Sequence, residues 1–249
     1  MEANIACFIF DLDGVLVDTA KYHYQAWRKL AQELGFELSP ETNELLKGVS
    51  RMKSLEIILE TGGLQATAEE KEVMATKKNA WYLEFITRMQ PSEVLPNVKS
   101  FVRKSRAKNL KTAIGSASKN TPTILERTDL TALFNAVVDG NVTAVAKPDP
   151  EVFLKAAEAV GVPPSACVVF EDSASGVEAA RRAGMYVVGI GSPQALKDAD
   201  LVISGFSGIT PTMIVKQLER LHTSEEHASS SDAFAFAPRP SPNPSRVSC

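Results

Sequence analysis

Short apolar runs alternate with longer amphipathic stretches along most of the 249-residue chain. The apolar runs are short enough to be buried strands, and they lie at 5–9, 110–114, 136–138, 166–170, 186–190 and 201–203. Segments with helical spacing lie between the later runs, around 97–108, 120–128, 148–160 and 174–183. Strands that alternate with helices predict an α/β fold with a doubly wound parallel sheet.

A long helical stretch interrupts this alternation after the first strand. Bulky residues recur in it at helical spacing, at Tyr22, Trp27, Leu30 and Leu34, and Gly35 is a plausible helix end. Further helical segments are predicted around 41–47, 51–61 and 67–88, with no strand pattern among them. We therefore predict an inserted α-helical cap domain over 18–90, and a catalytic core formed by 1–17 and 91–221.

The composition changes again near the C-terminus. Residues 222–249 contain seven serines and four prolines, and they show no helical or strand period. Such a segment has too few apolar residues to pack against a core. We predict a disordered tail over 222–249.

Composition and charge narrow the possible partners. The net charge of -3 argues against a protein that coats nucleic acid. No apolar run approaches the roughly 20 residues that cross a bilayer, and the first strand begins too early to leave room for a signal peptide. The three cysteines, an odd number without metal-ligand spacing, indicate reduced thiols. We expect a cytoplasmic monomer with small-molecule partners, and neither nucleic-acid nor membrane binding.

Polar side chains follow four of the predicted strands. They are Asp11 and Asp13 after the first, Ser116 and Ser118 after the second, Lys147 after the third, and Glu171 and Asp172 after the fourth. Each group alone is explained by a turn or a helix cap. The carboxyl ends of parallel strands meet at one edge of a sheet, so together the four groups predict a single site.

These residue types suit phosphoryl transfer, which must neutralise and hold three charged oxygens. Asp11 and Asp172 are expected to bind Mg²⁺, with Glu171 as a further ligand or as the partner of a metal-bound water. Lys147 supplies a positive charge, and Ser116 offers a hydroxyl before a helix start that can bind an anion. Asp11 is the expected nucleophile, and Asp13 the expected general acid and base.

The motifs Asp11-Leu12-Asp13-Gly14-Val15, Ser116, Lys147-Pro148 and Glu171-Asp172 resemble those of the haloacid dehalogenase-like superfamily. The resemblance implies a Rossmann-like core whose smaller helical cap is inserted after the first motif. It also implies that Asp11 forms an aspartyl-phosphate and that the backbone carbonyl of Asp13 helps to bind Mg²⁺. The implied metal residues are Asp11, Asp13, Glu171 and Asp172.

The cap motifs are similar to those of the β-phosphoglucomutase family. They are Asp18 to His23, Lys47-Gly48-Val49-Ser50-Arg51 and Lys78-Asn79, together with Ser116 to Asn120 in the core. That family interconverts β-glucose 1-phosphate and glucose 6-phosphate through bound β-glucose 1,6-bisphosphate. The implied substrate-binding residues are Thr19, His23, Lys47, Gly48, Val49, Ser50, Arg51, Lys78, Ser116, Ala117, Ser118, Lys119, Asn120 and Lys147. The resemblance also implies that His23 and Lys78 position Asp13 when the cap closes.

A mutase needs a second phosphate site, because each phosphate of the bisphosphate must reach the nucleophile in turn. Arg51 is the best candidate for it, since a guanidinium binds phosphate in a bidentate manner, and 118–120 can complete the site. The alternative for Arg51 is a surface ion pair with Glu56 or Asp18.

Several simpler explanations stay open for other residues. His23 can be a structural histidine, Thr19 a helix N-cap, and 119–120 a solvated helix start. Gly115, where alanine is common in the family, is expected to loosen the distal phosphate loop, and Ala146 stands where a polar residue is often found. The competing functions are a sugar-phosphate phosphatase on the same scaffold and a non-catalytic binding module.

Overall fold

The core of the protein is a six-stranded parallel sheet with the order β3-β2-β1-β4-β5-β6. The computed structural model describes residues 4–46 and 49–232. The strands are β1 (Cys7–Phe10), β2 (Lys111–Gly115), β3 (Ala136–Val138), β4 (Cys167–Glu171), β5 (Tyr186–Ile190) and β6 (Leu201–Ile203). Each coincides with a predicted apolar run to within a residue or two, so the predicted sheet is confirmed.

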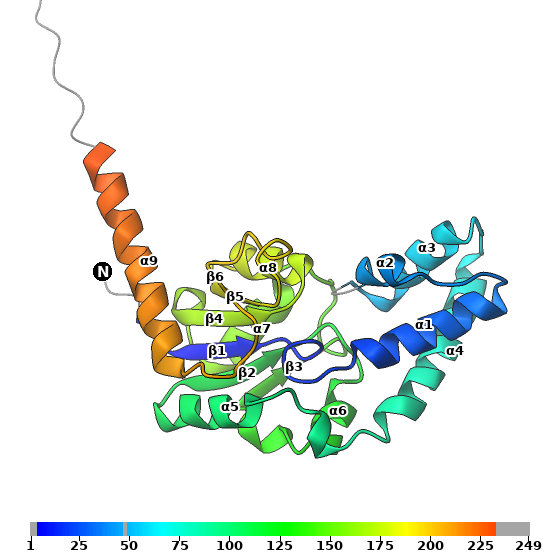
Figure 1. Cartoon of the computed structure of the whole chain (residues 1–249), viewed down its shortest axis with the longest axis horizontal. Coiled ribbons are helices and arrows are strands. Elements are labelled where there is room, and N and C mark those ends of the chain that lie inside the picture. The colour runs from blue at the N-terminus through cyan, green and yellow to red at the C-terminus, as the bar shows by residue number, and fades with distance from the viewer. Residues whose placement is uncertain (1–3, 47–48, 233–249) are drawn as a thin grey trace, which may run out of the picture.

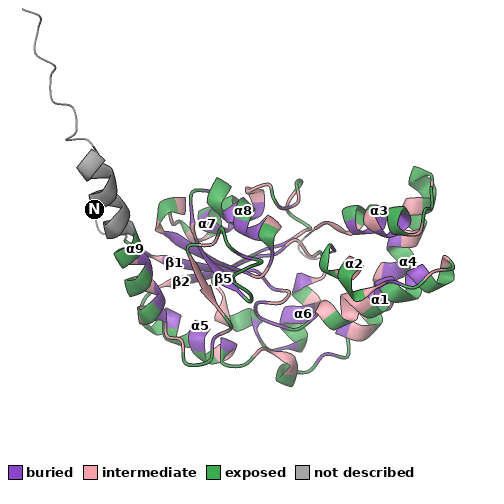
Figure 2. Ribbon diagram, turned by 45° about the horizontal axis from the view of Figure 1, so that its top comes forward, coloured by how far each residue is buried: buried purple, intermediate pink, exposed green. Residues whose placement is uncertain are grey.

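Helices cover both faces of this sheet, as Figure 1 shows. They are α5 (Val98–Ala107), α6 (Thr121–Arg127), α7 (Glu151–Val160), α8 (Ala174–Arg182) and α9 (Pro211–Asp232). Short 3-10 helices lie at Pro91–Glu93, Thr131–Leu133 and Pro164–Ala166. The central strands β1, β2, β4 and β5 are almost wholly buried, the edge strands β3 and β6 are partly exposed, and the helices expose their outer faces (Figure 2).

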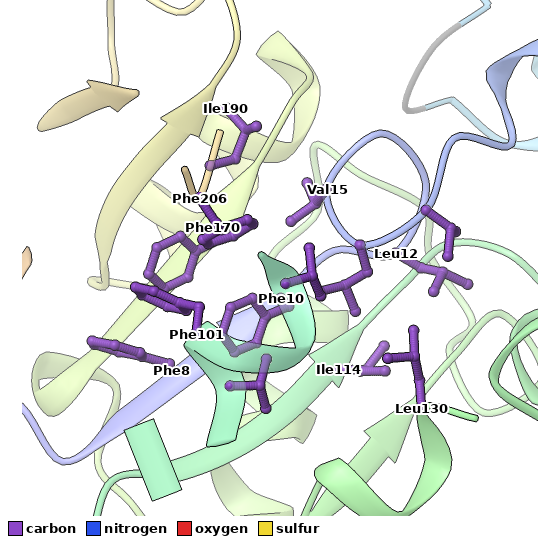
Figure 3. Packing of buried hydrophobic residues seen from close by; sticks show 14 of the residues in the cluster. Phe8, Phe10, Leu12, Val15, Phe101, Ile114, Leu130, Phe170, Ile190 and Phe206 are labelled. Atoms are coloured by element: carbon purple, nitrogen blue, oxygen red, sulfur yellow. The ribbon is translucent and has the colours of Figure 1, made fainter. Parts of the chain in front are cut away.

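Alternate residues of the central strands enter two different cores. Phe8 and Phe10 of β1 join one apolar cluster, and Cys7 and Ile9 join the other. Because successive side chains of a strand point to opposite faces, this alternation places one core on each side of the sheet. The first core is rich in aromatic rings (Figure 3), with the rings of Phe10 and Phe170 stacked 4.8 Å apart. The packing fixes the neighbouring ends of β1 and β4.

The cap consists of four helices between β1 and α5. They are α1 (Ala20–Glu33), α2 (Pro40–Glu44), α3 (Arg51–Thr61) and α4 (Ala68–Ile86). Trp27 and Leu30 of α1 pack with Leu55 and Ile58 of α3 in a third apolar cluster, so the cap has its own core. The helical insertion is confirmed, and its exact limits at 18 and 90 stay a prediction.

The two chain segments that connect cap and core are held together. Val17 bridges to both Asp13 and Val94, and the backbone N–H of Leu95 donates to the carbonyl of Leu16 at 2.9 Å. The Glu93 carboxylate accepts a hydrogen bond from Tyr22 and forms an ion pair with Lys21, both at the start of α1. These contacts place the cap beyond the carboxyl ends of the strands, at the opposite end of the molecule from α9 (Figure 1).

The C-terminal prediction requires a correction. Helix α9 continues to Asp232, ten residues beyond the predicted start of the tail at His222. Once a helix is nucleated by its packed first half, each further residue adds a hydrogen bond, so apolar spacing is not needed for it to continue. Residues 233–249 lie outside the described residues. Within the described chain, no helix combines the length and the hydrophobicity that crossing a membrane requires.

Candidate active site

The polar strand ends meet in a cavity of about 370 Å³ between the sheet and the cap. Among the predicted site residues, those that line it are Asp11, Asp13, His23, Val49, Ser50, Arg51, Lys78, Ala117, Ser118, Lys119, Asn120, Lys147 and Asp172. Thr19, Ser116 and Glu171 are buried beside this lining. Lys47 and Gly48 lie outside the described residues. The structure therefore brings together residues from four strand ends and from the cap.

Three carboxylates cluster at the cavity, where Asp11 and Asp172 line it and Glu171 is buried beside them. Asp11, Glu171 and Asp172 each offer an oxygen within 4.8 Å of the others. The Nζ of Lys147 lies 2.6 Å from Oδ1 of Asp11 and 2.8 Å from Oε2 of Glu171. When all three carboxyls are ionised, they and the ammonium of Lys147 together carry a net charge of -2. Carboxylate oxygens with that net charge fit a hard divalent cation such as Mg²⁺.

The surroundings shift the proton affinities of this cluster. Burial raises the pKa of Asp11 well above its usual value, Lys147 acts against this, and the Glu171 charge adds to it. For Lys147, burial favours a lower pKa, but the charges of Asp11 and Glu171 outweigh it and raise the pKa. Lys147 is therefore held as a cation.

Two glycines allow the carboxylates to approach. Gly14 has a φ of +80°, and a Cβ there would overlap the carboxylate of Asp172. A Cβ at Gly176 would overlap Glu171 in the same way. The other oxygen of Glu171 accepts hydrogen bonds from the backbone and the hydroxyl of Ser173, at 3.1 and 2.7 Å. Glu171 is thus held on both sides.

Asp13 lies apart from the three carboxylates. Its Oδ1 accepts a hydrogen bond from the hydroxyl of Thr19, which makes no N-cap bond to α1. Burial raises the pKa of Asp13, while the Thr19 hydrogen bond lowers it. Thr19 is thus the N-cap residue of α1 by position, but its hydroxyl binds Asp13 and does not cap the helix. A raised pKa suits a carboxyl that gives and takes protons.

The cap contributes a buried lysine surrounded by rings. The Nζ of Lys78 lies 3.0 Å from Nδ1 of His23, 4.4 Å from the ring centre of Trp27 and 4.9 Å from that of Tyr82. Burial, then the nearby charge of Arg51, lowers the pKa of Lys78 to about 7, while Asp13 acts in the opposite direction. Burial and the Lys78 charge likewise hold the pKa of His23 well below its usual value.

Arg51 points into the cavity from the start of α3. Within the described residues it forms no ion pair with Glu56 or Asp18, and Glu56 pairs instead with Lys53 at 3.4 Å. Burial lowers the pKa of Arg51, and the charge of Glu72, another lining residue, raises it. The guanidinium is therefore available to an anion in the cavity.

The core loop that lines the cavity together with Arg51 is ordered by its own side chains. The Oγ of Ser116 accepts from the backbone of Ser118 at 3.1 Å, and the Oγ of Ser118 accepts from the backbone of Asn120 at 3.2 Å. The Nδ2 of Asn120 donates to Oδ1 of Asn79 on α4 at 3.0 Å, so this loop also contacts the cap. Ser116 itself is buried and orders the loop.

The expectation that Gly115 loosens this loop is wrong. Gly115 is the last residue of β2, and a Cβ there would lie 2.7 Å from the Phe153 ring. Its missing side chain makes room for close packing of α7 against the sheet.

Sequence reasoning missed part of the cavity wall. The missed residues include Trp27, Asn43, Leu46, Ser54, Glu72 and Thr143 to Val145. Trp27 lies one helical turn after His23 and therefore on the same helix face, so the spacing could have predicted that Trp27 also lines the site. The loop after β3 has no periodicity, and nothing in its sequence marks it as part of the wall.

A parallel α/β core, an aspartate pair after its first strand and a helical cap over the strand ends define a capped α/β enzyme. Residues 5–184 match the family model of the haloacid dehalogenase-like hydrolases. The chain belongs to this family.

Individual relatives extend over most of the chain. A protein named β-phosphoglucomutase from Bacillus subtilis is 38% identical over 219 residues, 87% of this chain and 97% of its own. A crystal structure of β-phosphoglucomutase from Clostridium difficile has a TM-score of 0.84 at 38% identity, and covers 88% of this chain and 99% of that one. A phosphorylated carbohydrates phosphatase from Thermotoga maritima is 33% identical over 184 residues, 71% of this chain and 81% of its own.

Proposed function

We propose that this enzyme is a Mg²⁺-dependent β-phosphoglucomutase that interconverts β-glucose 1-phosphate and glucose 6-phosphate. One observation supports the proposal: Lys147 of the core and Arg51 of the cap line the same cavity. We assign Asp11, Lys147 and the acidic cluster to one side of it, and Arg51 with the 118–120 loop to the other. A bisphosphate has one phosphate for each side.

The first side holds the reacting phosphate. Asp11 attacks the phosphorus, and Lys147, held as a cation, neutralises charge on the phosphoryl oxygens. When bound by Asp11, Glu171 and Asp172, with the backbone carbonyl of Asp13 as a further ligand, Mg²⁺ reduces the repulsion between the anions. The transfer leaves an aspartyl-phosphate on Asp11.

Asp13 moves the proton in both halves of the reaction. It protonates the leaving oxygen of the sugar and later accepts the proton of the attacking hydroxyl. Its hydrogen bond with Thr19, at the start of the cap, ties its orientation to the cap position. His23 and Lys78 add cap groups near the same carboxyl.

The second side decides whether the acceptor is a sugar or water. A phosphatase needs to hold one phosphate, whereas a mutase must also hold the distal one while the sugar reorients. Arg51 with 118–120 is suited to that task, and Lys47 to Ser50 belong to the same proposed sugar-binding loop. β-Glucose 1,6-bisphosphate is then the intermediate and the primer. We expect a monomer that acts on small sugar phosphates.

Replacing Arg51 tests this assignment. Arg51→Ala should lower mutase turnover by about 10- to 100-fold, the worth of a charged hydrogen bond, and should change hydrolysis of p-nitrophenyl phosphate little. Lys53→Ala, on the exposed side of the same helix, is the matched control and should change neither rate. Equal losses of both activities in Arg51→Ala would favour a phosphatase without a dedicated distal site.

A further inference from the structure

Two buried lysines line the cavity, and their surroundings are opposite. The side chain of Lys147 is 2% exposed and contacts the carboxylates of Asp11 and Glu171. Lys78 is also 2% exposed, but its ammonium lies against the rings of His23, Trp27 and Tyr82. No carboxylate of the described residues is within salt-bridge distance of Lys78. The two amines therefore differ in what stabilises their protons.

This difference decides which amine is a nucleophile, because only the unprotonated amine has a free electron pair. The groups that act on Lys78 come from several elements: His23 and Trp27 on α1, Arg51 on α3, Tyr82 on its own helix, and Asp13 after β1. Burial and Arg51 outweigh Asp13, so its pKa falls to about 7. The pKa of Lys147 moves the other way, since its carboxylate partners retain the proton.

We propose that Lys78 is a covalent capture site for phosphorylated aldehydes. The cavity that it lines also contains Arg51 and the 118–120 loop, so a phosphate can be held there while the aldehyde reaches Nζ. The preference for a phosphate rests on the function proposed above, and the reactivity of the amine does not.

The chemistry is the condensation of an amine with a carbonyl. The Nζ electron pair forms a bond to the carbonyl carbon, and the carbonyl oxygen takes a proton to give a carbinolamine. Loss of that oxygen as water leaves an imine, so that one amine and one aldehyde give one imine and one water. The two protons that the amine nitrogen loses leave with that oxygen as water. No oxidant or reductant is required, and the step is reversible.

Pyridoxal 5′-phosphate is the probe for this site. The full chain is treated with the probe, reduced with borohydride to fix the imine as a secondary amine, and mapped by peptide mass spectrometry. Lys78 should be the main labelled residue, with half-maximal labelling near pH 7. Lys147 should stay unlabelled, and pyridoxal, which lacks the phosphate, should label Lys78 at least about tenfold less, as for the loss of one charged hydrogen bond.

Two variants sharpen the result. Lys78→Arg should abolish the main label, whereas Lys77→Arg, at the neighbouring exposed lysine that pairs with Glu33 at 2.6 Å, should leave it unchanged. The site-resolved labelling of the unmodified chain decides the question even where Lys78→Arg does not fold. Labelling spread evenly over exposed lysines, or equal labelling by pyridoxal, would overturn the proposal. Because labelling requires no turnover, an enzyme that labels at Lys78 but lacks mutase activity would contradict only the proposed function.

Discussion

Asn120 in the core and Asn79 in the cap are joined by a hydrogen bond of 3.0 Å between Nδ2 and Oδ1. The donor belongs to the loop proposed to hold the distal phosphate, and the acceptor follows Lys78 on α4. The contact therefore links the distal phosphate site to the position of the cap, next to the proposed chemistry.

Asn79→Ala should weaken closure of the cap over the sugar. A neutral hydrogen bond contributes about 0.5–1.5 kcal/mol, so we expect the KM for β-glucose 1-phosphate to rise by about 2- to 10-fold. Hydrolysis of p-nitrophenyl phosphate should change less, because it needs no distal contact. Steady-state kinetics measures both, with Lys77→Ala on the exposed face of α4 as the control. An unchanged KM would contradict a role for this bond in closure.

Lys147→Met should both inactivate and destabilise the enzyme. It leaves the carboxylates of Asp11 and Glu171 buried without their cation, and we expect the free energy of unfolding to fall by about 3–5 kcal/mol. Urea denaturation without Mg²⁺ measures this. Lys155→Met removes an exposed pair with Glu151, and should cost less than about 1 kcal/mol. Similar losses in the two variants would argue against the buried ion-pair cluster.

Gly14→Ala should weaken Mg²⁺ binding. Its Cβ would overlap the Asp172 carboxylate, so the carboxylate must move, and we expect the affinity to fall by about tenfold or more. Gly161→Ala is matched to it, since Gly161 also has a positive φ, of +69°, but has open space around its Cβ position. Isothermal titration with Mg²⁺ should separate them. Equal affinities in the two variants would count against Asp172 as a ligand.

Lys78→Met should change how stability depends on pH. The pKa of Lys78 is about 7 in the folded chain and about 10.4 in an unfolded one, so between these values the unfolded chain binds the extra proton. Stability contributed by this site therefore rises with pH across that window. From pH 7 to 9, the free energy of unfolding of the unmodified chain should rise relative to that of Lys78→Met by up to about 1.4 kcal/mol per pH unit, as measured by denaturation. If the difference in free energy of unfolding between the two chains stays constant with pH, the pKa of Lys78 is not lowered in the folded chain.

The strand ends could be predicted from the sequence because buried parallel strands are continuous apolar runs. Asp11 and Asp172 follow such runs, so a parallel sheet topology is enough to predict that they meet at one edge. The contacts of Lys78 and Asn79 could not be predicted in this way. Helical periodicity tells which face of α4 is buried, but Trp27 and Asn120 reach that face from other elements whose placement depends on the cap connections.

The C-terminal boundary shows another limit of sequence reasoning. Leu218 still packs into the core, whereas the sequence after His222 is rich in serine and has no apolar period. Helix α9 nevertheless continues to Asp232, because backbone hydrogen bonding does not depend on side-chain burial.

The most direct test of the central claim is to follow β-glucose 1-phosphate by ³¹P NMR with the enzyme, Mg²⁺ and a trace of β-glucose 1,6-bisphosphate. We predict that the glucose 6-phosphate signal grows as the substrate signal falls, while inorganic phosphate stays a minor product. Release of inorganic phosphate at the rate of sugar-phosphate loss would contradict the account and identify a phosphatase.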